Sequence, residues 1–280
     1  MIEQRFFGHP ESPLFGVYHR PRGSRVHATN RAAIICPPIG QEYNRTHWTL
    51  RLLANQVARK GVHVLRMDYQ CIGDSAQSVD QIESLACWRR NIEQAMDHLK
   101  KETGAETVML IGHRIGASLA AQVAMQRPDV NGLVAWEPVL HGKQYLDALR
   151  KMHATMLDLW VCKMSTPNDQ QVEEILGSRY QRSLVTDIDQ LEVKLEQVIQ
   201  PQLITDLTAN MNLYSHPQDG NQFLIEDKRA SSWYDLNELE SAYLRPEAMR
   251  QTVKKIDDMF ARLDRFGVLS REHTTSEAAK

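Results

Sequence analysis

The sequence predicts an α/β protein with a mostly parallel sheet that helices cover on both faces. The main observation is that short apolar runs alternate with helical segments between residues 32 and 138. Such alternation is typical of parallel strands joined by crossover helices. In addition, apolar residues make up 42% of the 280-residue chain, which is enough for a sizeable core, and no internal repeat is apparent.

The first elements of this core follow in chain order. Residues 14–19 alternate loosely and predict an early, half-exposed strand. The apolar run 32–38 ends in Pro-Pro and predicts a buried strand that stops there. Residues 47–61 then predict a helix that Gly61 closes. The apolar positions at helical spacing in this segment are Trp48, Leu52, Leu53 and Val57.

The alternation continues to residue 138. Residues 62–69 predict a second buried strand, and 78–104 predict a long helix with one apolar face. Residues 107–112 form the next apolar run, and 117–126 read as a helix rich in small residues. The run 132–138 predicts a fourth buried strand, so the expected sheet is mostly parallel.

A change of character follows at residue 141. Residues 141–212 read as successive helices without a buried strand, which is the pattern of a helical cap inserted into the core. The interruptions within this segment are Pro167, Gly177 and Pro201.

The chain then returns to the core. Residues 221–227 predict a short strand, and 246–266 predict a helix that opens with proline and packs back on the sheet. The expected organisation is therefore a first core part (1–140), a helical cap (141–212), a second core part (213–268) and a disordered tail (269–280).

Composition excludes several classes of function. The formal net charge is only -2, which gives no reason to expect nucleic acid or an anionic membrane as the main partner. The four cysteines form no CxxC pair, so we expect reduced thiols in a cytoplasmic protein, with no metal and no cofactor. The N-terminus is not a signal peptide, and no apolar run reaches the length of a membrane span.

The segment TVMLIGHRIGASLAA (107–121) contains the most informative motif. Gly112 and Gly116 flank a turn between a strand and a small-residue helix. Many hydrolases place a nucleophilic serine in the middle of such a turn, in the pattern GxSxG. Here His113, Arg114 and Ile115 lie between the glycines, and Arg114 stands at the position of the serine.

The chain resembles α/β-hydrolases of the serine aminopeptidase-like group, and most closely the exosortase A system-associated hydrolases of type 2. The matching segments are 36–76, 110–120 and 133–150. The resemblance implies an α/β-hydrolase core in a bacterial protein. In that family the turn also tends to hold arginine, so Arg114 looks like a family trait.

A second candidate region follows the strand at 32–38. In the resembled fold this loop supplies an oxyanion-hole amide. Ile39 and Gly40 still offer backbone N–H groups here, although a rigid turn without a catalytic role is equally consistent with Pro37-Pro38. Glu42 and Arg45 lie just beyond, where open α/β sheets bind ligands.

The other members of a catalytic triad are not evident. In this fold the order is nucleophile, acid, histidine. Glu137, Glu226 and Asp227 follow or end apolar runs and could serve as the acid. No histidine stands where the base is expected: the candidates are His141, His216 and His273. A displaced nucleophile, Cys71 or Ser118, is the remaining route to a covalent mechanism.

Two hypotheses account for Arg114. In the first, Arg114 and backbone amides at Ile115 and Ile39 bind an anion at the helix N-terminus. In the second, Arg114 pairs with an internal carboxylate such as Glu137 or Asp227 and closes the former pocket.

Three functions remain open at this point. In the first, the chain acts on an ester, thioester or acyl compound by a route without a triad; a role in bacterial polysaccharide or lipid-linked biosynthesis is what the resemblance implies. Alternatively, it is a non-catalytic protein that binds an anionic or acylated small molecule or supports a protein partner or another copy of itself. The third function is hydrolysis with a displaced nucleophile. In the cap, methionines and other apolar residues at 152–164 suit either an acyl-binding pocket or the cap's own core.

Overall fold

The computed structural model describes residues 2–22, 31–77, 81–82, 84–159, 170–198, 202–206, 222–226 and 246–277. Of residues 202–206, 222–226, 246–248 and 265–277 it describes the backbone alone, as it does for Glu196. Among the described residues, no helix is both long and apolar enough to cross a membrane.

An eight-stranded sheet forms the centre of the molecule, with the strand order β1-β2-β4-β3-β5-β6-β9-β10. β1 pairs antiparallel with β2, and β2 pairs antiparallel with β4, whereas the other neighbours are parallel. The predicted fold class is therefore confirmed. The strand bounds are β1 Ile2–His9, β2 Ser12–His19, β3 Ala32–Cys36, β4 His63–Met67, β5 Val108–His113, β6 Val130–Trp136, β9 Gln202–Asp206 and β10 Gln222–Glu226.

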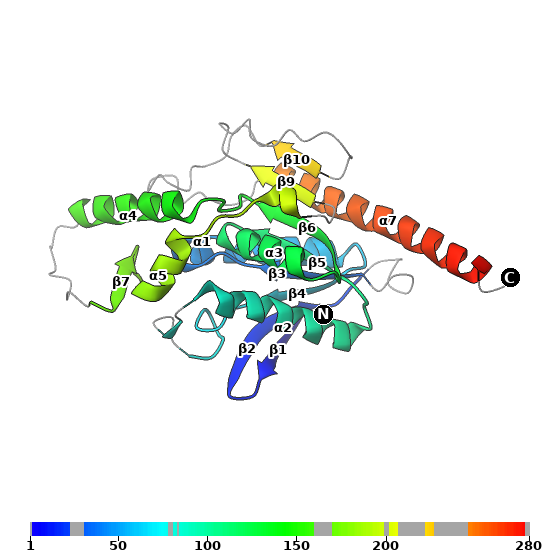
Figure 1. The fold of residues 1–280 in the computed structure, drawn as a ribbon, viewed down its shortest axis with the longest axis horizontal. Helices are drawn as coiled ribbons and strands as arrows, with labels where there is room; N and C mark the ends of the chain where they lie inside the picture. Colours follow the sequence, from blue (N-terminus) through cyan, green and yellow to red (C-terminus); the bar gives the residue numbers. More distant parts are fainter. Residues whose placement is uncertain are drawn as a thin grey trace.

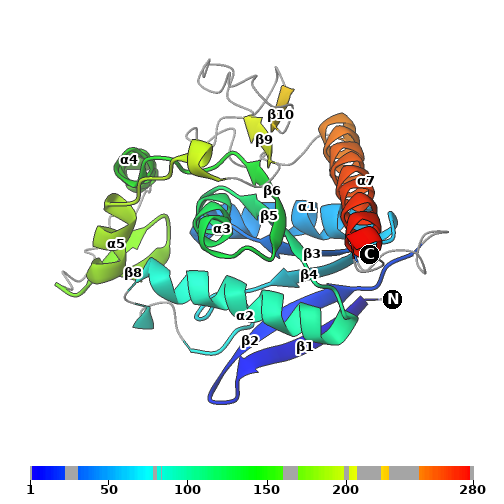
Figure 2. The same ribbon diagram turned by 45° about the vertical axis from the view of Figure 1, so that its right-hand side comes forward.

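Helices cover both faces of the sheet (Figure 2). α1 (Gly40–Ala58) and α7 (Pro246–Glu277) pack on one face, where they share an apolar cluster with Ala33, Ile35 and Val64. α2 (Leu85–Thr103) and α3 (Ile115–Gln126) pack on the other face and form part of the larger cluster. Both faces of the central strands are thus buried, which explains why β3 and β5 are uninterrupted apolar runs.

The cap lies at one end of the sheet, at the left of Figure 1. It begins with α4 (Gly142–Leu159) and continues with a hairpin of β7 (Val172–Ile175) and β8 (Ser178–Gln181). α5 (Arg182–Asp189) and a short 3-10 helix (Leu195–Gln197) follow. The expectation that 141–212 contains helices alone is wrong, because two hairpin strands lie inside it and β9 joins the central sheet beside β6.

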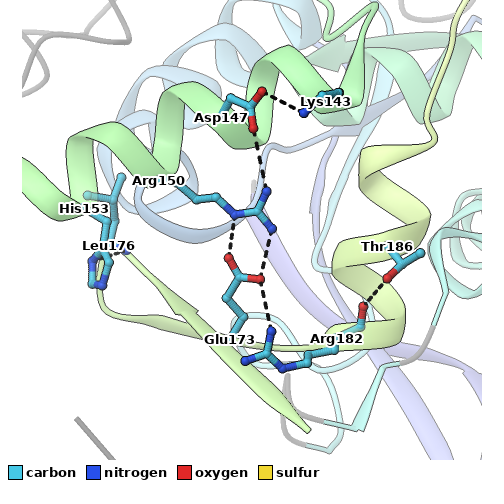
Figure 3. Close-up of polar contacts among 8 residues, drawn as sticks. All are labelled: Lys143, Asp147, Arg150, His153, Glu173, Leu176, Arg182 and Thr186. Carbon is cyan, nitrogen blue, oxygen red and sulfur yellow. Dashed lines mark hydrogen bonds and ion pairs between the residues drawn. The ribbon is translucent and has the colours of Figure 1, made fainter. Parts of the chain in front are cut away.

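An ionic chain ties α4 to the hairpin (Figure 3). The guanidinium of Arg150 binds Glu173 through two contacts, Nε to Oε1 at 2.7 Å and Nη2 to Oε2 at 3.0 Å. The backbone N–H of Leu176 donates to Nδ1 of His153 at 3.1 Å. The first contact joins α4 to β7, and the second joins α4 to the turn after β7. The hairpin is thus held against the helix by a charge-assisted pair and a hydrogen bond as well as by apolar packing.

Three other expectations need correction. α1 begins at Gly40 rather than at His47, and its buried positions include Leu50, Leu53 and Val57, whereas Trp48 and Leu52 are exposed. A strand, β1, precedes the first expected one and pairs with it. The predicted disordered tail is helical up to Glu277 as a continuation of α7, which no proline after Pro246 interrupts.

Candidate functional site

The turn between β5 and α3 has the strained geometry of a sharp strand-to-helix elbow. Arg114 connects the two elements with φ 53° and ψ -126°, a conformation that side-chain-bearing residues rarely adopt. Its backbone N–H donates to the carbonyl of Trp136 at 2.9 Å and fixes the elbow against β6. The predicted elbow is thus present, with arginine at its tip.

The two flanking glycines are required by close packing. A Cβ atom on Gly116 would lie 2.2 Å from the carbonyl oxygen of Pro37 and 2.4 Å from that of Cys36. A Cβ atom on Gly112 would lie 2.3 Å from the Cα of Ala117. These distances are too short for any side chain, so the glycines allow α3 to approach the strands and the β3–α1 loop.

The side chain of Arg114 is buried in an ion pair. Its Nε lies 2.8 Å from Oε1 of Glu42, and the two side chains are only 5% and 3% exposed. The second carboxylate oxygen, Oε2, accepts a hydrogen bond from the hydroxyl of Tyr145 at 3.1 Å. The guanidinium also lies 5.6 Å from the centre of the Tyr145 ring and donates at 3.5 Å to the carbonyl of Glu137.

This cluster combines three separate parts of the chain. Arg114 comes from the elbow, Glu42 from the first turn of α1, and Tyr145 from α4 of the cap. An acidic residue in the first turn of a helix is stabilised by the helix dipole. The N-terminus of α1 therefore stabilises Glu42, and Glu42 pairs with Arg114 at the elbow before α3. The cap contributes the third member, Tyr145.

The electrostatics keep Tyr145 in its protonated form. Burial, and secondarily the negative charge of Glu42, raises the pKa of the Tyr145 hydroxyl well above its usual value. The hydroxyl therefore donates to Glu42 throughout the physiological range. Sequence reasoning missed Tyr145, because a tyrosine in an amphipathic cap helix gives no local signal of a polar role.

The second hypothesis for Arg114, an internal carboxylate partner, agrees with this geometry. The carboxylate that the structure describes beside Arg114 is that of Glu42, which the hypothesis did not name. The contact described between Arg114 and Glu137 goes to the backbone carbonyl of Glu137. Glu137 directly follows β6, is buried and has φ 46°. Asp227 and His216 lie outside the described residues, and so does any contact they make.

His113 and Ile39 are also buried near the elbow, and Gly40 is partly exposed. The ring of His113 packs edge-on against Trp136, and burial, with the nearby charge of Arg114, lowers its pKa well below the usual value. Ile39 immediately precedes α1, and Gly40 has φ +57°. A Cβ on Gly40 would lie 2.3 Å from the Tyr180 hydroxyl, so the cap closes directly over this loop.

The remaining candidates are dispersed. Ile115 opens α3 and is fully buried, and Arg45 lies half-buried three residues beyond Glu42 on α1. His141 pairs with Glu192 at 2.7 Å in an exposed position. Glu226 ends β10, and His273 lies in α7, but the structure describes the side chain of neither.

The two proposed alternative nucleophiles have structural partners. The hydroxyl of Ser118 is fully buried within α3 and donates to the carbonyl of Val139 at 2.6 Å. Cys71 is buried in a loop with φ 65°, and its Sγ lies 3.8 Å from the side-chain oxygen of Gln77. In the described part of the chain, no group of three His, Cys, Asp or Glu side chains is arranged to hold a metal.

Comparison with known proteins gives a family and a fold. The model of the family described as serine aminopeptidase, S33, matches residues 42–268. A search among curated proteins found no significant match. Similar solved structures include Est1E from Butyrivibrio proteoclasticus with ferulic acid bound, which is 15% identical with a TM-score of 0.60 over 92% of this chain and 98% of that one.

Two further structures have the same fold. The Xanthomonas campestris protein XC6422, described as an α/β serine hydrolase without a lid, is 13% identical with a TM-score of 0.55 over 94% of both chains. The Pyrococcus furiosus esterase PF2001 is 13% identical with a TM-score of 0.52 over 73% of this chain and 69% of that one. At these identities the likeness concerns the fold.

Proposed function

Because the chain belongs to the serine aminopeptidase S33 family of α/β-hydrolases, we propose that it is a pseudo-hydrolase. It keeps the family's fold, does not hydrolyse through a serine nucleophile, and acts by binding a small molecule or a partner. The observation that carries this proposal is the buried pair between Arg114 and Glu42 at the elbow. A guanidinium neither attacks a carbonyl nor accepts a proton at physiological pH.

The geometry of the alternative nucleophiles supports the same proposal. The Ser118 hydroxyl donates its proton to a backbone carbonyl and lies inside a helix that is buried against the sheet. Cys71 lies in the loop after β4, and its buried Sγ contacts a neutral side chain rather than a histidine in the contact described above. Neither arrangement activates a nucleophile.

The ligand class that we propose is a small anionic or acylated molecule. The elbow is a positively charged helix N-terminus that already holds a carboxylate, since Glu42 occupies the guanidinium of Arg114. A site with this chemistry suits an anion at the carboxyl ends of the parallel strands. In this proposal Glu42 is the internal occupant, and a ligand anion reaches Arg114 by exchange with it. Ile39 and Gly40 lie at the start of the helix that carries Glu42, and Ile115 directly follows Arg114.

The wider context is proposed from the resemblance of segments 36–76, 110–120 and 133–150 to the exosortase A system-associated hydrolases of type 2. We place the chain in a bacterial polysaccharide or lipid-linked biosynthetic pathway, as a binding or partner subunit. Cys36, Cys71 and Cys87, the cysteines that the structure describes, form no disulfide with one another, which supports a reducing, cytoplasmic compartment.

An activity-based probe tests the central claim. We expect a fluorophosphonate to leave the purified protein unlabelled, and a panel of p-nitrophenyl esters and acyl thioesters to be hydrolysed no faster than in buffer. An active serine hydrolase in the same assay is the positive control. Labelling of Ser118 or of any other serine, or hydrolysis that Arg114→Ala abolishes, would contradict the proposal.

Native mass spectrometry tests the ligand class separately. We expect the protein to carry a co-purified anionic or acylated molecule, and Arg114→Ala to lose it while remaining folded. A protein that is both unlabelled and free of ligand, and that is captured with a neighbouring gene product, would favour the partner role over the ligand role.

A further inference from the structure

Exposed apolar side chains gather on one face of the molecule, away from the elbow. Among the described residues, five large hydrophobic side chains are exposed, and four of them are Ile2 (42%), Phe6 (64%), Trp48 (68%) and Leu52 (42%). Trp48 and Leu52 are one turn apart on α1, and Ile2 and Phe6 lie on the same side of β1. Ile2 and Leu52 line the same cavity, so the two pairs adjoin.

This cavity is strongly basic. It has a volume of about 250 Å³ and lies between α1, the start of β1 and the end of β2. Arg20, Arg22 and Arg59 line it, and none of the described residues in its wall is an aspartate or a glutamate. The polar neutral residues in its wall are His19, Asn55 and Gln56.

The surrounding charges leave this face positive. Glu3 pairs with Arg20 and offsets one of the three charges. Lys60 pairs with Asp257 of α7 at 3.5 Å. Arg51 adds a further positive charge, with its guanidinium 5.0 Å from the centre of the Trp48 ring. The backbone N–H of Arg22 donates to the carbonyl of Ala58 at 2.8 Å, which holds the arginine-bearing segment against α1.

We propose that this face docks on an anionic lipid surface, with a lipid phosphate in the cavity of Arg20, Arg22 and Arg59. The side chains of Trp48, Leu52, Phe6 and Ile2 then enter the boundary between headgroups and acyl chains. Tryptophan is enriched at that boundary, and apolar side chains next to basic ones are typical of peripheral membrane binding.

Charge and shape favour a lipid surface over an acidic protein. Guanidinium groups bind phosphate through paired hydrogen bonds, and the cavity presents three of them in one hollow. Ile2 and Leu52 line that hollow, and Phe6 and Trp48 lie further along the same strand and helix. The net charge of the whole chain is -2, so this local concentration of arginine is not apparent from the composition.

Vesicle co-sedimentation tests the proposal with the intact protein. We expect binding to phosphatidylcholine vesicles that contain phosphatidylglycerol, little binding to phosphatidylcholine alone, and release as salt is raised. Each arginine near an anionic surface strengthens binding roughly 5-fold. Arg22→Gln with Arg59→Gln should therefore weaken binding roughly 25-fold, and Trp48→Ser with Leu52→Ser should also weaken it.

Matched controls on other faces separate a surface site from a general charge effect. Arg90→Gln with Lys101→Gln removes the same charge from α2, on the opposite face of the sheet. Leu159→Ser removes the fifth exposed apolar side chain, on α4. Both controls should bind as the wild type does.

Three results would overturn the assignment. The first is equal binding of the wild type to neutral and anionic vesicles. The second is a loss of vesicle binding in Arg90→Gln with Lys101→Gln as large as that in Arg22→Gln with Arg59→Gln. The third is competition by inorganic phosphate or by poly-glutamate at the same concentration of charge as the vesicles, which would point to a free anion or an acidic protein instead. All the substituted residues are exposed, so unchanged thermal unfolding shows that each variant is folded.

Discussion

Nε of Arg114 and Oε1 of Glu42 lie 2.8 Å apart in a buried ion pair, although 72 residues separate them in the sequence. The elbow of this hydrolase fold thus carries a positive side chain, and the carboxylate paired with it belongs to the chain itself. The pair joins the turn before α3 to the first turn of α1.

The first prediction concerns the energetic coupling of this pair. Glu42→Gln leaves a buried guanidinium without its countercharge and should lower the free energy of unfolding by about 3–5 kcal/mol. Arg114→Met combined with Glu42→Gln removes both charges and should recover much of that loss, because no buried charge remains. Urea unfolding of the two single variants and the double variant measures the coupling. Additive losses, with a coupling below about 0.5 kcal/mol, would show that the two residues do not depend on each other.

Tyr145 gives a second prediction. Tyr145→Phe keeps the ring over Arg114 and removes only the hydroxyl that donates to Glu42. Because the acceptor is a buried carboxylate, the free energy of unfolding should fall by about 1.5–3 kcal/mol. The effect should shrink when Glu42→Gln is already present, since the acceptor is then uncharged.

Tyr180→Phe is the matched control for this prediction. Tyr180 is a second buried tyrosine of the cap, and its hydroxyl bonds Ser178. It should show a smaller loss, because its partner carries no charge. Equal losses for the two tyrosines would contradict a specific role of the Tyr145–Glu42 bond.

The sequence predicts the elbow well and its partner poorly, for a physical reason. Close backbone contacts require glycine at positions 112 and 116, so the elbow is visible in the sequence as a glycine pair. β3 and β5 are buried on both faces, so each strand is visible as an apolar run. The pairing of Glu42 with Arg114 depends on where α1 begins. Because α1 starts at Gly40 instead of seven residues later, Glu42 falls in its first turn and faces Arg114.

The cap was harder to predict because its strands are short. β7 and β8 have four residues each, and the turn between them uses Leu176 (φ 51°) and Gly177 (φ 79°). Two positive φ angles in succession are typical of a tight hairpin turn, and only the glycine is visible as a signal. The interpretation of Gly177 as a break between helices missed this hairpin. β9 has only five residues, and its place beside β6 is a long-range feature.

A third prediction tests the close packing at the elbow. Gly116→Ala would place a Cβ atom 2.2 Å from the carbonyl oxygen of Pro37, and neither backbone can move without disturbing α3 or the β3–α1 loop. We expect a loss of at least about 3 kcal/mol or failure to fold, measured by chemical unfolding and by soluble yield.

Gly8→Ala is the control for this substitution. Gly8 has φ +85°, but a Cβ atom there would meet nothing closer than 3.5 Å. Its cost should be limited to about 1 kcal/mol of backbone strain. A Gly116→Ala protein as stable as Gly8→Ala would mean that the elbow is looser than these distances indicate.

The last prediction concerns acid stability and His19. Burial lowers the pKa of His19 to about 4, although its Nδ1 bonds the side-chain oxygen of Asn55. An unfolded histidine has a pKa of about 6.5. Between these two values the unfolded state binds the proton more readily than the folded state, so stability falls as the pH drops from about 6.5 towards 4.

In His19→Gln the free energy of unfolding should fall less steeply as the pH drops, because glutamine does not titrate. Glutamine can still accept a hydrogen bond from Arg66 and bond Asn55. At pH 4 the difference in pH-dependent stability should approach about 3 kcal/mol. Urea unfolding at several pH values measures it, with His9→Gln, at an exposed histidine of β1, as the control that should follow the wild type. If the free energy of unfolding of His19→Gln and of the wild type changed with pH in parallel, His19 would take up its proton as readily in the folded protein as in the unfolded one. Another charge would then have to offset the effect of burial on His19, because its contacts with Asn55 and Arg66 do not supply one.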